Sequence, residues 1–134
     1  LEVAEARFPL FFRRHEFRPD SGGAGRYRGG VGAELEIVVE VEEPAVANTA
    51  GDGVRHGACG ILGGSDGVPH RYVLKSEGRP ERALATKEVG IVIRPGDVLD
   101  VRSGGGGGFG APAERTPEAR ARDLRLGFVS AGGR

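Results

Sequence analysis

Hydrophobic and polar residues alternate most regularly in residues 33–43, AELEIVVEVEE. One face carries Leu35, Ile37, Val39 and Val41, and the other carries Glu34, Glu36, Glu40 and Glu42. Because successive side chains of a strand point to opposite faces, this pattern predicts a half-buried β-strand. We expect the glutamates to lie on a solvated face, where they discourage pairing with another chain, and we assign them no chemistry.

Four other segments also have the character of strands. They are FPLFFRRHEF (8–17), RYVLKS (71–76), VGIVI (89–93) and DVLDV (97–101). The later three are rich in β-branched residues, which favour strands. The first segment ends at Pro19-Asp20, where we expect a turn. Arg94-Pro95-Gly96 joins the last two segments, and since this order suits a type II turn, we predict a hairpin-like corner there.

The tail contains the only helix signal. Thr116 can cap a helix, Pro117 fits its first position, Glu118 suits the positive end of the dipole, and Gly127 can end it. A helix of about ten residues is marginal alone, so it must dock on the sheet or on a partner. We expect docking through the stripe of Ala121, Leu124 and Phe128.

Glycine is the dominant feature of the composition, with 25 glycines in 134 residues. They cluster at 22–32, 57–67 and 104–110, unlike the strict repeat of collagen or a disordered linker. Since glycine permits tight corners, we interpret the clusters as loops. The sequence predicts a mainly β fold, with glycine-rich loops joining strands of a sandwich- or barrel-like sheet and one short C-terminal helix. Residues 1–134 form a single domain or domain fragment on this interpretation.

Charge and cysteine content exclude several classes of partner. The 19 Lys and Arg residues balance 19 Asp and Glu residues, so no net field attracts nucleic acid or an anionic membrane. No stretch has the roughly 18 consecutive apolar residues that a membrane helix needs. Cys59 is the single cysteine, and a lone thiol fits a reducing compartment. We predict a cytoplasmic protein without nucleic-acid or membrane partners.

The first glycine cluster, DSGGAGRYRGGVG (20–32), holds candidate binding residues. In an extended chain Arg26 and Arg28 point to the same side, and guanidinium groups suit bidentate binding of carboxylate or phosphate. The alternative is that Asp20 caps a turn and both arginines pair with carboxylates of this or a neighbouring subunit. The candidates for substrate or interface binding are Ser21, Arg26, Arg28 and Arg55. Asp20 is a candidate catalytic residue.

His56 is the second catalytic candidate, because it lies in a loop beside Arg55. A solvent-exposed loop histidine is the alternative. Cys59 has no visible base partner, so we expect a small buried hydrophobe instead of a nucleophile. The spacing of His15, His56 and His70 matches no known metal site, and we predict no metal site within this chain.

The run Gly104–Gly108 invites comparison with a phosphate-binding loop. No Lys-Ser or Lys-Thr follows it, and its spacing fits neither nucleotide fingerprint, so we reject nucleotide binding here. Ordering each glycine costs about 1–2 kcal/mol. We therefore expect the run to pack against the subunit or an active-site wall, with direct ligand contact as the alternative. The candidate glycine-loop residues are Gly22, Gly23, Gly25, Gly29, Gly30, Gly63, Gly64, Gly105, Gly106 and Gly107.

Three motifs in order resemble the hydantoinase B/oxoprolinase family. They are DSGGAGRYRGGVG (20–32), GILGGSDG (60–67) and the block RPGDVLDVRSGGGGGFGAPAERTPEARARDLRLGFVS (94–130). The chain departs from the family pattern at Ala111, where an acidic residue is expected before proline. It departs again at Ala58-Cys59, where many members carry prolines. Because of these departures, the resemblance does not indicate which substrate group within the family this chain belongs to.

The resemblance implies an enzyme of two parts. An A-type ATP-binding subunit or domain phosphorylates a small-molecule substrate, and the B-type part completes hydrolysis or carboxylation. This chain would be the C-terminal part of the B-type subunit and would contact the A-type part and its own N-terminal part. ATP and a divalent metal would serve the full enzyme, with none bound by this segment alone, whose isolated form we expect to be inactive.

Three functions follow from the resemblance. The first is ATP-dependent hydrolysis of a cyclic amide, of the 5-oxoprolinase or N-methylhydantoinase type. The second is ATP-dependent carboxylation of a ketone such as acetone or acetophenone. The third is a structural or interface module without catalytic groups.

Overall fold

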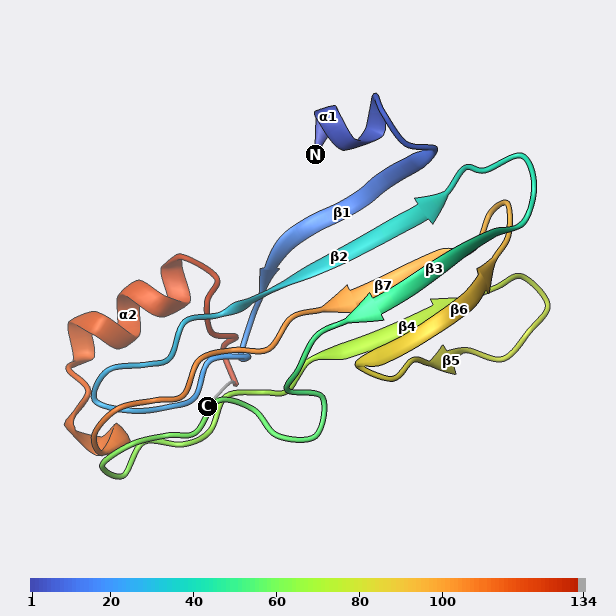
Figure 1. The fold of residues 1–134 in the computed structure, drawn as a ribbon. Coiled ribbons are helices and arrows are strands. Elements are labelled where there is room, and N and C mark those ends of the chain that lie inside the picture. Colours follow the sequence, from blue (N-terminus) through green and yellow to red (C-terminus); the bar gives the residue numbers. More distant parts are fainter. Residues whose placement is uncertain (133–134) are drawn as a thin grey trace. The chain divides into compact units, whose positions relative to one another are not determined.

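β-Strands make up most of the regular structure in the computed structural model, which describes residues 1–132 (Figure 1). The chain folds into two compact units, each built from three separate stretches of sequence. The first unit comprises Leu1–Glu16, Glu34–Asp52 and Arg71–Arg102, and the second comprises Phe17–Ala33, Gly53–His70 and the chain from Ser103 onward. The predicted mainly β fold with a short C-terminal helix is confirmed.

The elements follow one another along the chain as two groups. The first is the short helix α1 (Glu2–Glu5) and the strands β1 (Leu10–Arg18), β2 (Gly32–Val39), β3 (Ala45–Ala50), β4 (Arg71–Lys75), β5 (Arg82–Ala83), β6 (Lys87–Ile93) and β7 (Val98–Arg102). The second is a 3-10 turn, η1 (Pro112–Glu114), and the helix α2 (Pro117–Arg125). Of these, β3, β5, α1 and η1 had no signal that we recognised in the sequence.

The strands of the first unit form two sheets. The larger sheet has the order β1-β2-β7-β4-β5, and the smaller one pairs β3 with β6. The β2–β7, β7–β4 and β4–β5 pairs are antiparallel, as is β3–β6. Because β1 and β5 are free edges of the larger sheet, the sheet is open and does not close into a barrel.

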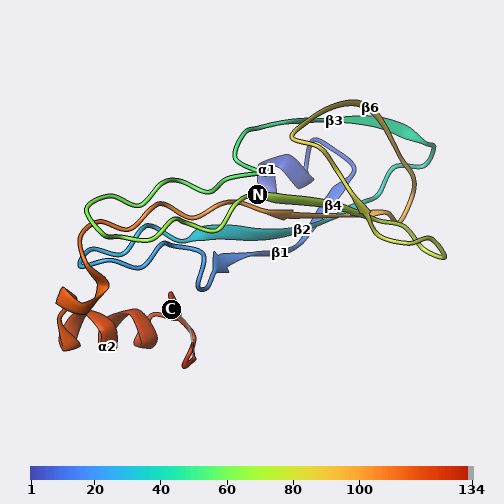
Figure 2. The same cartoon turned by 90° about the horizontal axis from the view of Figure 1, so that it is seen from below.

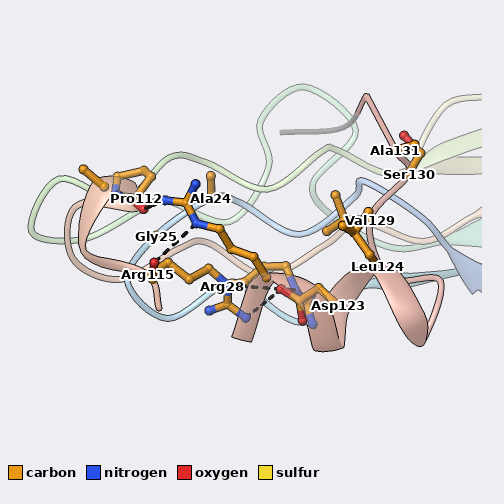
Figure 3. A pocket seen from close by; sticks show the side chains of 12 residues that line it. Ala24, Gly25, Arg28, Pro112, Arg115, Asp123, Leu124, Val129, Ser130 and Ala131 are labelled. Atoms are coloured by element: carbon orange, nitrogen blue, oxygen red, sulfur yellow. Dashed lines mark hydrogen bonds and ion pairs between the residues drawn. The ribbon is translucent and has the colours of Figure 1, made fainter. Parts of the chain in front are cut away.

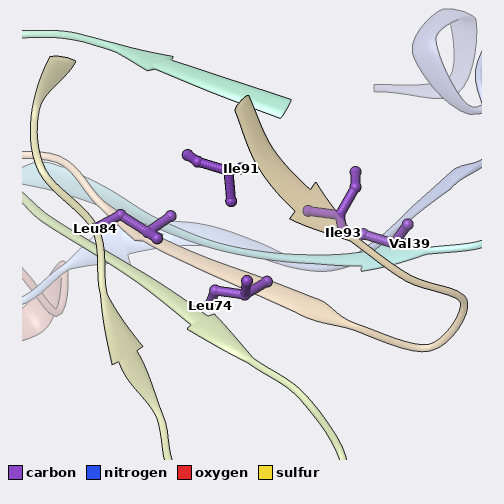
Figure 4. Close-up of a cluster of buried hydrophobic side chains, with 5 residues drawn as sticks. All are labelled: Val39, Leu74, Leu84, Ile91 and Ile93. Atoms are coloured by element: carbon purple, nitrogen blue, oxygen red, sulfur yellow. The ribbon is translucent and has the colours of Figure 1, made fainter. Parts of the chain in front are cut away.

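Five buried apolar side chains form the core of this unit between the two sheets (Figure 4). They are Val39, Leu74, Leu84, Ile91 and Ile93. The apolar face that the alternation of residues 33–43 predicted is confirmed at Val39, which is 1% exposed. The strand itself ends at Val39 and not at residue 43.

The turn at residues 94–96 has the predicted conformation, but the two strands that it connects do not pair with each other. Gly96 adopts a φ of +81°, and the Asp97 N–H donates to the Arg94 carbonyl at 3.1 Å. The predicted turn is therefore confirmed. The hairpin is wrong, because β6 pairs with β3 while β7 pairs with β2 and β4. Burial of Ile91 and Ile93 places β6 over the face of the larger sheet instead of beside β7.

The acidic face of β2 is paired and half-buried. Arg14 lies 3.4 Å from Glu34 and 3.3 Å from Glu36, and Lys75 lies 2.8 Å from Asp100. The side chains of Glu34 and Glu36 are only 20% and 21% exposed. The solvated face that we predicted is therefore wrong at Glu34 and Glu36, because β1 and β4 bring charged partners that the spacing within residues 33–43 does not show. Glu40 and Glu42 are exposed, as predicted.

Asp100 makes this face sensitive to acid. Burial by itself raises the pKa of the Asp100 carboxyl, but hydrogen bonds from Arg102 and Lys75 outweigh it, and the net pKa is lowered. The carboxyl therefore contributes stability that is complete above its unfolded pKa of about 3.9 and is lost as the pH falls through the lower folded value. We expect Asp100→Asn to lower the urea midpoint at pH 7 and to differ less from the parent protein below pH about 3.9. Urea titrations across this range check the expectation, and a constant difference would contradict it.

The second unit contains a bundle of extended glycine-rich segments, which we call the glycine bundle and define as residues 20–32, 57–68 and 103–110. These segments run side by side over a long distance (Figure 2). The Val68 N–H donates to the Ser21 carbonyl, and the Ser65 N–H donates to the Ala24 carbonyl, both at 2.8 Å. Between these two hydrogen bonds the acceptor moves forward by three residues and the donor moves back by three. In a β-strand, by contrast, side chains alternate with a period of two residues. A step of three is typical of the polyproline II conformation.

Backbone contacts leave no room for a side chain at most glycines of the glycine bundle. A Cβ atom would lie 1.9 Å from the Gly106 carbonyl oxygen at Gly29 and 1.9 Å from the Ser21 carbonyl oxygen at Gly105. At Gly107 it would lie 2.0 Å from the Cys59 carbonyl oxygen. The glycine clusters are therefore a packed layer of backbone and not simply loops between strands. The expected packing of the five-glycine run is confirmed.

Candidate functional site

A cavity of about 320 Å³ lies in the second unit beside α2 (Figure 3). Residues of the first glycine cluster and of the C-terminal tail line it. Its walls are apolar at Pro112, Leu124 and Val129. The lining also carries three arginines and one carboxylate, which are Arg28, Arg115, Arg120 and Asp123. The cavity is thus an apolar space with a charged side.

Asp123 holds two of these arginines together. Its Oδ2 accepts from Arg115 Nη2 at 2.6 Å and from Arg115 Nε at 3.1 Å, and Arg28 Nε lies 3.3 Å away. The Asp123 side chain is 9% exposed, and those of Arg28 and Arg115 are 14% and 17% exposed. Arg28 also stacks over the Phe128 ring at 5.0 Å. The cluster therefore fixes α2 against the glycine bundle.

This ion pair replaces the docking that we predicted for the helix. The capping signals are confirmed, because Thr116 Oγ1 accepts from the Ala119 N–H at 3.2 Å and Gly127 adopts a φ of +69°. The predicted apolar stripe is wrong at Ala121 and Leu124, which are both exposed, Leu124 at 51%. Phe128 does pack, with its ring centroid 5.4 Å from that of Phe17, while Asp123 is the buried residue of the helix. Two arginines converging on Asp123 supply the partner that makes its burial tolerable.

Arg26 and Arg28 both face the C-terminal tail. Arg26 lies 3.7 Å from Glu114 and over the Tyr27 ring at 5.6 Å, and its side chain is 56% exposed. Arg28 pairs with Asp123. Both candidate arginines thus contact carboxylates of this chain, as the alternative interpretation of the first cluster proposed. Contact with a substrate or another subunit stays a prediction.

Asp20 and Ser21 lie where the first cluster begins. Asp20 adopts a φ of +58°, and its Oδ1 accepts from the Ser130 N–H at 3.0 Å. Ser21 is 1% exposed, and its hydroxyl donates to the Arg18 carbonyl at 2.6 Å and accepts from the Gly32 N–H at 2.8 Å. The Asp20 side chain therefore joins the first cluster to the C-terminal tail, and the Ser21 side chain closes the two ends of its own stretch. Their proposed catalytic and binding roles stay predictions.

The remaining candidates lie on an exposed segment. Arg55 and His56 are both exposed and line none of the cavities described here. Cys59 is also exposed, so the expected burial of this thiol is wrong. The reason is that its backbone carbonyl, and not its side chain, packs against Gly107. The positions of Arg55 and His56 leave their roles as predictions.

Three of the five amides in the five-glycine run are engaged within the chain. The N–H groups of Gly105, Gly106 and Gly108 donate to the carbonyls of Val68, Gly30 and Ser65 at 3.0, 2.8 and 2.9 Å. Because a phosphate cradle needs free N–H groups pointing at the ligand, this run does not fit a nucleotide. Within residues 1–132, no three His, Cys, Asp or Glu side chains are grouped so as to hold a metal ion.

Comparison with known proteins places this arrangement in a family. Residues 1–112 match the hydantoinase B/oxoprolinase family. The chain belongs to that family. This member of the hydantoinase B/oxoprolinase family is 31% identical to 5-oxoprolinase 1 of Arabidopsis thaliana, over 82% of the chain and 8% of the relative. It is 28% identical to caprolactamase subunit beta of Pseudomonas jessenii, over 99% of the chain and 23% of the relative.

Two solved structures share the fold of this family member. The crystal structure of the ATP-dependent caprolactamase of Pseudomonas jessenii matches with a TM-score of 0.80 and 28% identity, over 98% of this chain and 23% of that one. The nucleotide-free acetone carboxylase matches with a TM-score of 0.71 and 21% identity, over 97% and 21%. The chain thus spans less than a quarter of each of these relatives. Among residues 1–132, neither the length nor the apolar character of any helix suffices for a membrane crossing.

Arg28 and Gly25 of the cavity were among the sequence candidates, but the charged residues of its C-terminal side in this hydantoinase B/oxoprolinase family member were missed. Asp123, Arg115 and Arg120 lie in the tail, where we considered only helix signals. One signal was available, because Asp123 is an acidic residue in an arginine-rich helix, ARARDLR (119–125). An isolated acid among bases predicts ion pairing, although the partner Arg28 lies 95 residues away in sequence (123 − 28 = 95).

Proposed function

We propose that this chain is the C-terminal part of a B-type subunit of an ATP-dependent enzyme that hydrolyses small cyclic amides. The observation that carries the proposal is the likeness to the ATP-dependent caprolactamase, which extends over 98% of the chain with a TM-score of 0.80. The Arabidopsis relative named 5-oxoprolinase 1 points to the same substrate class. Caprolactam and 5-oxoproline are both lactams, so the shared chemistry is opening of a cyclic amide by water.

Within such an enzyme we assign this chain a scaffold role around the ring-opening site. The glycine bundle excludes side chains and joins its backbone groups to one another, as at Gly29 and Gly105. Such a layer is rigid and holds attached segments in fixed positions, which a preorganised site requires. Asp20 and Arg28 serve this positioning through side-chain contacts with the C-terminal tail, and Ser21 serves it through its backbone carbonyl, which accepts from the Val68 N–H.

The ATP-binding part lies outside this chain in the proposal. Three of the five amides in the five-glycine run donate to backbone carbonyls, and the described residues provide no grouped metal ligands. We therefore assign ATP and a divalent metal to an A-type partner and to the rest of the B-type subunit. The relative named caprolactamase subunit beta supports assembly with another subunit. We also assign a cytoplasmic location, which the single cysteine, Cys59, supports because a lone thiol suits a reducing compartment.

The test is an assay of the complete complex with lactams. We expect 5-oxoproline or caprolactam to be opened to an amino acid, or a hydantoin to an N-carbamoyl amino acid, with ATP consumed in proportion and no need for bicarbonate. Mass spectrometry of the product and measurement of ADP release check both expectations. A complex that leaves every lactam intact but carboxylates acetone or acetophenone only with bicarbonate would sink the hydrolase proposal and establish the carboxylase alternative.

A further inference from the structure

The cavity beside α2 carries more positive than negative charge. Three guanidinium groups line it, those of Arg28, Arg115 and Arg120, against the single carboxylate of Asp123, which leaves two positive charges (3 − 1 = 2). Glu114, another acid of the tail, pairs with Arg26. A guanidinium group that has no carboxylate partner can bind an anion through charge-assisted hydrogen bonds. The cavity is therefore suited to an anion.

Arg120 is the arginine most available to a ligand. Arg115 directs Nε and Nη2 to Asp123 and Nη1 to the Arg26 carbonyl. Arg120 is exposed and donates only to the carbonyls of Arg115 and Pro112, at 3.3 and 2.9 Å. Its charge is thus not matched by a carboxylate among the described residues. Arg28 Nε is not available in the same way, because it is buried and lies 3.3 Å from Asp123 Oδ2.

Apolar groups lie on two sides of the cavity and decide what kind of anion fits. Leu124 and Val129 lie together on one side, and Pro112 lies on the other (Figure 3). The volume of about 320 Å³ is in the range of small-molecule sites. Apolar walls favour an organic body over a small inorganic ion, and a guanidinium group binds its carboxylate.

We propose that this cavity binds a small organic carboxylate with an apolar body, held by Arg120 and oriented by Leu124 and Val129. The choice of a lactam carboxylate as the probe rests on the proposed function. The proposal itself concerns binding alone and involves no ATP. It gives the C-terminal tail a ligand of its own, beside its role in fixing α2.

Equilibrium binding to the complete protein, measured by calorimetry without ATP, tests the site. The probes are 5-oxoproline, 2-pyrrolidinone, which has the same ring without the carboxylate, and inorganic phosphate. We expect 5-oxoproline to bind at least about tenfold more tightly than 2-pyrrolidinone, since a charge-assisted hydrogen bond contributes this much. Equal binding of the two lactams, no binding, or tighter binding of phosphate would each overturn the proposal.

Matched variants on α2 locate the binding. Arg120→Gln should weaken 5-oxoproline binding about ten- to a hundredfold. Arg122→Gln is the control, because Arg122 is exposed on the same helix and does not line the cavity. Leu124→Trp should fill the cavity and abolish binding while circular dichroism stays unchanged. Equal effects of the two arginine variants, or undiminished binding in Leu124→Trp, would place the ligand elsewhere.

Different results would overturn the proposed carboxylate site and the proposed lactam hydrolysis. Lactam hydrolysis with no carboxylate-dependent binding would leave the function standing and remove the site. Binding at Arg120 in a complex that opens no lactam would keep the site and remove the function.

Discussion

Replacing Gly29 with alanine is expected to destabilise the protein by about 3 kcal/mol or more, because overpacking at a rigid site is among the costliest changes. The new Cβ would lie 1.9 Å from the Gly106 carbonyl oxygen. That oxygen belongs to backbone and cannot rotate away as a flexible side chain would. The Gly29 N–H also donates to the Gly23 carbonyl at 2.9 Å, so a shift would strain a second segment. Urea denaturation measures the change in unfolding free energy.

Gly30→Ala is the matched control for this prediction. Gly30 is the next residue, yet no atom lies within 4 Å of the position its Cβ would occupy. Both substitutions restrict the unfolded chain equally, so their difference reports the folded state. We expect Gly30→Ala to change the unfolding free energy by no more than about 0.5 kcal/mol. Similar losses in both variants would mean that close backbone packing does not hold the bundle together.

Replacing Asp123 with asparagine is expected to release α2 from the second unit. The change leaves the positive charges of Arg28 and Arg115 close together without their shared carboxylate. Removing one partner of a buried ion pair costs about 3–5 kcal/mol, and we expect the low end because both arginines keep some solvent contact. Hydrogen exchange should rise across α2, where the side chain of Asp123 is the one that is buried.

Asp52→Asn is the control for the ion pair. Asp52 lies 3.1 Å from Lys87, but the two side chains are 89% and 72% exposed. Exposed pairs of this kind contribute little, so neither stability nor exchange should change measurably. If Asp123→Asn behaves like Asp52→Asn, the cluster at Asp123 does not fix the helix, and the apolar contacts of Phe128 must do so.

Local sequence patterns correctly predicted the elements that are specified by interactions between residues close together in the chain. Thr116, Pro117 and Gly127 specify the ends of α2 through bonds within a few residues, and the structure follows them. Gly96 likewise takes the positive φ that its turn requires. Failures arose where the partner is distant, as when β6 paired with β3 instead of β7. Spacing within a segment carries no information about which remote strand lies beside it.

The glycine clusters show the same division between local and remote information. Their positions and order in the sequence resembled the family and were sufficient to identify it. The sequence did not show the physical role of these glycines. Backbone freedom is a property of each glycine itself, whereas the close approach of two backbone segments depends on the remote segment that packs against it. The need for glycine at residue 105 comes from Ser21, and at residue 107 from Cys59. Gly105 and Gly107, which were candidate loop residues, are therefore required for close backbone packing.

The sequence by itself determined the mainly β class, the apolar face of residues 33–43, the capped C-terminal helix and the family. Each of these depends on short periodicities or on the order of motifs, which the chain carries directly. Tertiary structure alone decided the packing of the glycine segments at a step of three, the burial of Asp123 and the cavity beside α2. The physical reason is that steric exclusion and charge pairing act between atoms close in space, whatever their separation along the chain.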